Sequence, residues 1–470
     1  MRALIRVAAV ALAGATLYYA GLVNSIVIRT PDRFGAIVVV LAVIASLAML
    51  VFALVGTGTA DAAVRPSRTR DVRLHRATWL AVSAMSLVGL AWLAVAPRQH
   101  SADWTPYHND AIALNECAAR LLLEGRDPYT DLRLFPCFEA LGIGGDRTTP
   151  LQRGLFAAVP VYPSDDEIDM AWSARAADPS GNVEFEGRLS YPSLSVVLIA
   201  PWVALGWDSN VLYLLCLLGA MGLIVAKAPA GLRPFALTGL FAAACLEAFT
   251  VGGSADLLYA LPLVAAWIWR ERGWSGLLLG LAVATKQIAW FFVPFYLIAV
   301  VARQGPRVAA QRAVASLGIF VLANLPFVLH DGGAWLAGVL APLTAPSFPR
   351  GAGLIFLATN GVLPLWPSAV YAALEAAAGV AVLVVAWRTR HSSPELGVAL
   401  AVLPLFLARR SLFSYFFLAP LFAYAALVRL PLGDLRPAIA RASGAVTLFA
   451  LPARESRAPA PRQARGIGRG

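Results

Sequence analysis

The chain has 470 residues, of which 59% are hydrophobic and only 14% are charged, and its mean hydropathy is +0.69. This composition excludes a soluble domain, and the alternating pattern of a membrane β-barrel is absent, so the sequence predicts an all-α polytopic membrane protein. The formal net charge of +11 does not indicate a nucleic-acid partner, because the basic residues lie in short loops and in the C-terminal tail.

Long apolar runs predict a bundle of about twelve transmembrane helices. The N-terminal run resembles a signal peptide, but no clear cleavage site follows it, so we interpret it as an uncleaved first span. The shorter runs 191–206 and 351–363 are expected to form helices that do not cross the membrane. The expected spans lie near residues 3–24, 34–56, 77–96, 209–226, 233–250, 255–270, 274–285, 288–302, 313–330, 367–388, 396–408 and 411–429.

The distribution of charge orients these spans. The loop between the second and third spans contains five arginines, whereas residues 97–190 contain 8 Arg against 15 Asp and Glu. Because cytoplasmic loops are enriched in Arg and Lys, we expect both termini to be cytoplasmic, in a bacterial-type plasma (inner) membrane. The expected regions are N-terminal transmembrane helices at 1–96, an extracytoplasmic loop subdomain at 97–190, a transmembrane bundle at 191–429, and a basic disordered cytoplasmic tail at 430–470 that touches membrane lipids.

The polar stretch 101–129 is the centre of the predicted extracytoplasmic subdomain. From Asp110 onward its apolar residues recur on one face, which predicts an amphipathic helix that Gly125 and Pro128 terminate. Such a helix is expected to lie in the membrane interface rather than to cross it. Asp110, at the N-terminus of this helix, can direct a carboxylate toward a substrate, or it can be only the N-cap.

Cys117 and Cys137 both fall in this one segment, which is expected to face an oxidising compartment. A bridge between them would join the amphipathic helix to the chain after Tyr129, and two buried thiols are the open alternative. The cysteines form no metal-binding pattern with one another or with histidine, so we expect no metal and no cofactor.

Several basic residues are expected at the outer mouth of the bundle, against the usual enrichment of positive charge inside: Lys286, His330, Arg350, Arg409 and Arg410. Lys286 is one of only two lysines among 38 basic residues, so its presence suggests a specific role at this position. The alternative is that its side chain only extends from a helix end to the membrane interface. Arg409 and Arg410 are adjacent and therefore face different directions on a helix. One is expected to bind a ligand and the other to anchor the helix, and the sequence leaves open which.

An extracytoplasmic enzyme has no nucleotide donors, so for sugar transfer it uses a donor activated on a polyprenyl phosphate. The departing phosphate is a stable anion that needs cations rather than a general acid, and the acceptor hydroxyl needs one general base. The expected site is therefore one carboxylate facing one or two cations. Asp110 is the expected base with Asp103 as the alternative, and Lys286, Arg409 and Arg410 are the expected donor-phosphate ligands.

Five segments of the chain resemble those of a known family. They are NDAIALNECAARLLLEGRDPY, YPSLSVVLIAPWVAL at 191–205, GLLLGLAVATKQIAWFFVPFYLI at 276–298, ANLPFVLHDGGAWLAGVLAPL and RRSLFSYFFLAPL. Their order and topology are similar to the GT-C superfamily of membrane glycosyltransferases, close to the polyprenol-phosphate-mannose-dependent mannosyltransferases of glycosyltransferase family 87. In these enzymes the catalytic Asp lies in the first large external loop, which implies Asp110. The chain departs from the family in its two extra N-terminal spans, in YPS replacing YPP, and in its long external loop.

The resemblance implies a GT-C-like bundle and an inverting hexosyltransferase that moves a sugar, expected to be mannose, to a lipid or glycan acceptor. Weaker expectations for substrate contacts fall on Tyr107, His108, Gln287 and His330, of which Tyr107 and His108 could instead be interfacial anchors. A polytopic transporter is the alternative from another class, and a lipid-linked glycan ligase or polymerase is the alternative among enzymes.

Overall fold

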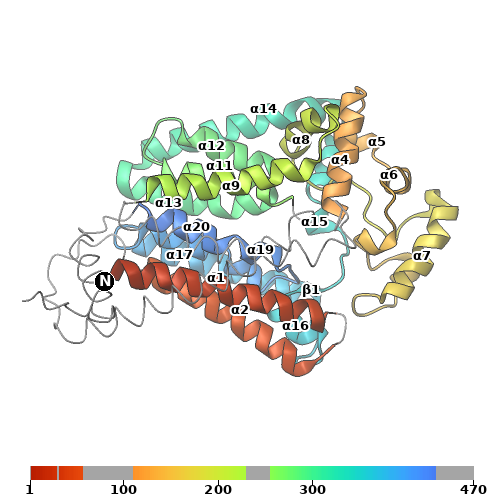
Figure 1. Cartoon of the computed structure of the whole chain (residues 1–470), viewed down its shortest axis with the longest axis horizontal. Coiled ribbons are helices and arrows are strands. Elements are labelled where there is room, and N and C mark those ends of the chain that lie inside the picture. Colours follow the sequence, from red (N-terminus) through yellow and green to blue (C-terminus); the bar gives the residue numbers. More distant parts are fainter. Residues whose placement is uncertain (1, 29–30, 57–109, 229–254, 430–470) are drawn as a thin grey trace, which may run out of the picture.

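The computed structural model describes residues 2–28, 31–56, 110–228 and 255–429, and this part of the chain is mostly helical (Figure 1). The expected spans 77–96 and 233–250 and the basic tail lie outside the described residues. Within the described ranges, the only strands are the two-residue β1 (Arg350–Gly351) and β2 (Arg410–Ser411), which pair in parallel. The all-α class predicted from composition is therefore confirmed for the described chain.

Six helical segments of the described chain are long and apolar enough to cross a membrane. They are α1 (Arg2–Val27), α2 (Arg33–Leu54), α9 (Ser209–Lys227), the 3-10 turn η4 (Gln287–Phe292) continued by α13 (Val293–Gln304), α14 (Pro306–Val339) and α17 (Ser368–Thr389). Each overlaps an expected span. The expected number of twelve is not confirmed.

Other apolar helices are shorter than a span. They are α8 (Leu194–Ala204), α11 (Leu257–Ile268), α12 (Ser275–Thr285), α16 (Leu354–Thr359), α18 (Gly397–Leu400), α19 (Ser414–Phe417) and α20 (Ala419–Leu427). At 11 residues α8 is about 16 Å long, too short to cross, as expected for the run 191–206.

The expected span 396–408 is not one continuous helix. It consists of α18 between the 3-10 turns η5 (Pro394–Leu396) and η6 (Pro404–Phe406). Both turns begin at a proline, and proline lacks the N–H that would continue an α-helix. The expected span 313–330 is instead part of the 34-residue α14, which is kinked at Asp331, where φ is −148° and ψ is 91°.

Close helix packing builds the bundle. A Cβ on Gly276 would lie 2.7 Å from the Arg312 carbonyl oxygen, and one on Gly280 would lie 2.8 Å from the Ser316 carbonyl oxygen. These two glycines, one helical turn apart, let α12 approach the backbone of α14, as small residues do in membrane helix pairs. Both glycines of the quoted segment 276–298 thus serve helix contact.

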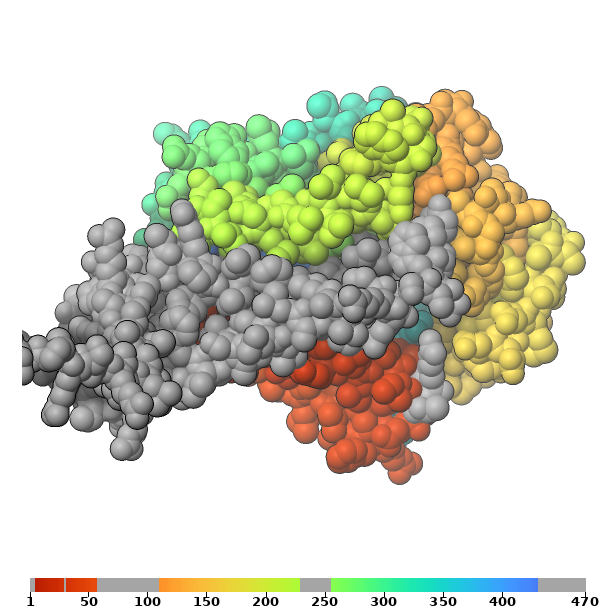
Figure 2. All heavy atoms as spheres, in the orientation of Figure 1, coloured from red at the N-terminus to blue at the C-terminus, as the bar shows by residue number. Residues whose placement is uncertain are grey.

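A polar subdomain lies at one end of this bundle, and its atoms abut those of α8 (Figures 1 and 2). The predicted amphipathic helix is confirmed as α4, which ends just before Gly125, a residue with a φ of +74°. The subdomain's helices are α4 (Asp110–Leu123), α5 (Pro128–Asp131), α6 (Leu134–Leu141), η1 (Gly145–Arg147), η2 (Gly154–Phe156), α7 (Asp165–Ala177) and η3 (Pro179–Gly181).

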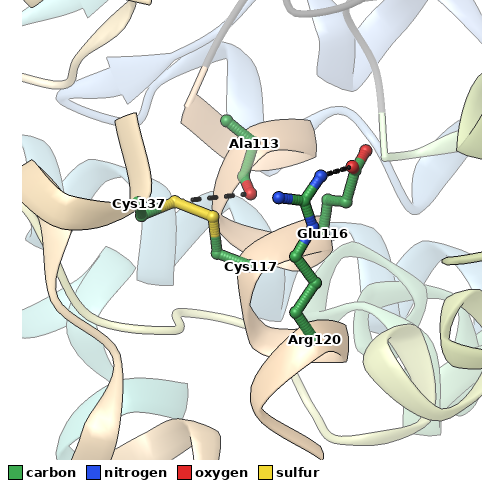
Figure 3. The surroundings of a disulfide bond; sticks show 5 residues. All are labelled: Ala113, Glu116, Cys117, Arg120 and Cys137. Atoms are coloured by element: carbon green, nitrogen blue, oxygen red, sulfur yellow. Dashed lines mark hydrogen bonds and ion pairs between the residues drawn. A yellow bond between two sulfur atoms is a disulfide. The ribbon is translucent and has the colours of Figure 1, made fainter. Parts of the chain in front are cut away.

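A disulfide joins Cys117 of α4 to Cys137 of α6, with their Cα atoms 5.9 Å apart (Figure 3). On the same helix Arg120 forms an ion pair of 2.7 Å with Glu116. The bridge that the sequence left open is therefore present, and it fixes α4 to the rest of the subdomain.

The subdomain is also attached to the bundle. The Tyr129 hydroxyl donates a 2.7 Å hydrogen bond to the Tyr191 carbonyl, and the Tyr129 ring packs against Phe327 of α14. The Ser193 hydroxyl donates a 2.6 Å hydrogen bond to the Ala323 carbonyl of α14. These contacts hold α5 and the 191–193 segment together against α14.

Candidate active site

A cavity of about 1700 Å³ lies where the subdomain meets the end of the bundle. Its walls come from α4, η1 and α7 of the subdomain, and from β1, β2, α19 and the C-terminal end of α12. The side chains that line it include those of Asp110, Arg147, Tyr162, Glu186, Tyr191, Asp256, Lys286, Arg350 and Arg410. It therefore brings together residues more than 300 positions apart in the sequence.

Asp110 is the first residue of α4 and borders this cavity. Burial raises the pKa of its carboxyl group above the ordinary value of 3.8, and the nearby Glu186 carboxylate adds to the rise. The Thr149 hydroxyl and the Arg410 guanidinium oppose it by favouring the charged form. A carboxylate with a raised pKa is a stronger base than an exposed one, so Asp110 is suited to accept a proton.

The structure distinguishes the two adjacent arginines of the RRS segment. Arg410 lies in β2, borders the cavity and donates a 3.1 Å hydrogen bond to the Ser347 hydroxyl. Arg409 donates to the Ser347 carbonyl and to the Gln152 side chain, both at 3.1 Å, and is not among the described residues that line the cavity. Arg409 therefore anchors the subdomain loop, and Arg410 is available to a ligand.

Arg350 is a further cavity residue that the expected site did not include. In the parallel pairing of β1 and β2, it is the register partner of Arg410. Its guanidinium carbon lies 4.1 Å from the centre of the Tyr162 ring, which also borders the cavity. Its position among basic residues at the expected outer mouth was the available signal, but nothing local in the sequence paired it with Arg410.

Lys286 follows the last residue of α12 and borders the cavity, but its charge is already balanced. Its ammonium lies 2.5 Å from a carboxylate oxygen of Asp256 and 4.5 Å from the centre of the Tyr191 ring. The sequence suggested a cation facing substrate, whereas the described side chain is one half of a buried ion pair.

The other residues expected to contact substrate differ in their position relative to the cavity. Gln287 borders the cavity, but its amide group donates to the carbonyls of Ser190 and Val339, at 2.7 and 2.8 Å. His330 is exposed on α14 and is not among the described residues lining the cavity. The other three expected residues, Asp103, Tyr107 and His108, lie outside the described residues.

No cluster of three or more His, Cys, Asp or Glu side chains suited to hold a metal ion occurs in the described ranges. Comparisons of the chain with protein-family models, with curated proteins and with solved structures found no match.

Proposed function

We propose that this protein is a membrane glycosyltransferase of the GT-C type. It moves a hexose, which we propose to be mannose, from a polyprenyl-phosphate donor to a lipid or glycan acceptor on the extracytoplasmic face. The observation that carries the proposal is the cavity in which Asp110 shares walls with Arg350 and Arg410. One basic carboxylate in the same cavity as two guanidinium groups, neither of which forms an ion pair among the described residues, is the set of groups that this transfer needs.

In the proposed reaction, Asp110 takes the proton of the acceptor hydroxyl as its oxygen forms a bond to the anomeric carbon. The bond between that carbon and the phosphate oxygen breaks, and its electron pair leaves with the phosphate. The donor diester, with one negative charge, becomes a phosphate monoester with two, while Asp110 becomes neutral. Attack opposite to the leaving group inverts the anomeric configuration.

The described contacts favour Arg410 as the principal donor-phosphate ligand. Arg410 borders the cavity. Within the described residues, its side chain forms one hydrogen bond, to the Ser347 hydroxyl. Lys286 keeps a secondary role in this proposal, because binding phosphate would require it to share its charge with Asp256. Arg409 has a positioning role, since it contacts the loop that carries Ser347.

The activity itself is tested by mixing the purified protein with labelled polyprenyl-phosphate mannose and a membrane extract. A transferase makes a new labelled glycolipid or glycan with loss of the donor. A transporter binds or moves the sugar without forming a product, and a ligase or polymerase transfers a preassembled glycan rather than one hexose. Either of these results would overturn the proposal.

The assignment of the base is tested by Asp110→Asn, which keeps the size and capping ability of the side chain but not its basicity. We expect turnover to fall by about two to four orders of magnitude, the range of general base catalysis, with donor binding preserved. Asp127→Asn is the matched control, because Asp127 caps α5 through the Tyr129 amide and is not among the described cavity residues. Wild-type turnover in Asp110→Asn, with loss of activity in Asp103→Asn, would move the role to Asp103.

A further inference from the structure

Two arginines lie side by side on one wall of the cavity. Arg350 and Arg410 are register partners in the parallel β1–β2 pair, and neighbouring strands are about 4.8 Å apart. Within the described residues, neither guanidinium forms an ion pair. Like charges in opposed positions on paired strands repel each other, so an anion bound between the two guanidiniums would relieve this repulsion.

Each arginine has its own neutral support. Tyr162 of the subdomain stacks under Arg350, and the Ser347 hydroxyl accepts from Arg410. Neither support neutralises a charge, but each restricts one side chain to a position facing the cavity. Two charged donors held in place before the ligand arrives are the arrangement expected for stabilising charge that develops during a reaction.

We propose that Arg350 and Arg410 form a two-arginine clamp that prefers a phosphate monoester dianion to a phosphodiester monoanion. This inference rests on the proposed function and adds Arg350 to its catalytic residues. The donor brings one negative charge to two guanidiniums, and a second charge appears only when the sugar–phosphate bond breaks. The clamp therefore binds the departing phosphate more tightly than the donor, which accelerates the chemical step and predicts inhibition by the lipid phosphate product.

The test measures binding without any sugar transfer. Isothermal titration of the purified full chain at pH 8 compares farnesyl phosphate with its methyl diester. We expect the monoester to bind at least about tenfold more tightly, the value of one additional charge-assisted hydrogen bond. The preference should disappear when the pH falls below the second pKa of the monoester, about 6, because the probe then has a single charge.

Substitutions assign the preference to the clamp. Arg350→Met should abolish the preference for the monoester, and Arg350→Lys should restore part of it. Arg147→Met is the matched control, since Arg147 also lines the cavity but pairs with Asp146 at 2.8 Å, so the preference should remain. Equal binding of the two probes by the wild type, or an unchanged preference in Arg350→Met, would overturn the inference.

The outcomes also separate this inference from the proposed function. Hexose transfer by a protein without the monoester preference would reject the clamp alone. A clear preference in a protein that transfers no sugar from any polyprenyl-phosphate donor would reject the transferase and keep a dianionic phosphate site.

Discussion

At Asp110, burial and neighbouring groups act in opposite directions on one carboxyl group. Burial raises its pKa, whereas Thr149 and Arg410 favour the carboxylate. A carboxyl group must be ionised before it can accept a proton. Asp110 therefore needs both effects: the raised pKa makes its carboxylate a stronger base, and the two partners keep it charged. Asp110 sits at a helix N-terminus, where an Asp that only caps the helix would also be found.

The pH dependence of turnover follows from this balance. We expect kcat/KM to fall as the pH decreases through the raised pKa of Asp110, at a pH above 3.8. Arg410→Met removes a cation that lowers this pKa, so the acid limb should move to higher pH. The measurement is a pH–rate profile of both proteins, with Arg147→Met as the control. An acid limb that stays in place in Arg410→Met would contradict the electrostatic effect of Arg410 on the pKa of Asp110.

Arg409 and Arg410 illustrate how backbone direction assigns roles to neighbouring residues. Their sequence positions differ by one, yet Arg409 contacts Gln152 while Arg410 faces the cavity. Both arginines were expected on a helix, but the strand β2 begins at Arg410. In extended chain, successive side chains point to opposite faces. The described contacts give Arg409 the anchoring role, and the binding of a ligand by Arg410 stays a prediction.

Among the elements, the β1–β2 pair depends on a glycine. Gly351 has a φ of +148°, and a Cβ there would lie 2.0 Å from the Ser411 carbonyl oxygen. Gly351→Ala should therefore separate the two strands and reduce binding of farnesyl phosphate by about tenfold or more. Gly379→Ala on α17 is the control, because a Cβ there meets no atom within 4 Å. Equal binding by the two variants would show that strand pairing does not position the arginines.

The disulfide between α4 and α6 closes a loop across a sequence separation of 20. Constraining such a loop in the unfolded chain stabilises the native state by about 3 kcal/mol. The double variant Cys117→Ser, Cys137→Ser should therefore unfold at a lower temperature than the oxidised wild-type protein. Wild-type protein treated with reductant should show the same decrease in unfolding temperature. Cys216→Ser, which changes a free cysteine on α9, should leave the transition near its wild-type position. Unchanged unfolding of the double variant would contradict the bridge.

At the scale of the whole molecule, the polar subdomain lies at one end of the bundle, with the cavity between them. The acidic balance of this segment predicts that this end faces outward. In a background without Cys216 and Cys245, a cysteine replacing exposed Ala174 of α7 should react with a membrane-impermeant maleimide in intact cells. One replacing Ser392, in a loop expected to be cytoplasmic, should react only after lysis. The reverse pattern would invert the topology and reject an external lipid donor.

The sequence by itself determined the features that depend on neighbours along the chain. Hydrophobic length predicted the all-α class and the positions of α1, α2, α9 and α17, because a span needs about 20 consecutive apolar residues. The period of 3.6 residues predicted α4, and with it the position of Asp110 at a helix start. Hydropathy did not predict the break in 396–408, since it does not register the backbone N–H group that Pro404 lacks.

Only the tertiary structure decided which charges meet. Arg350 and Arg410 are 60 positions apart, and two-residue strands are too short to leave a periodic pattern that would pair them. The ion pair of Lys286 with Asp256 likewise joins separate elements, so a lysine that seemed free in the sequence is compensated. Contacts of this kind depend on how distant segments pack, whereas hydropathy and periodicity report only on each segment by itself.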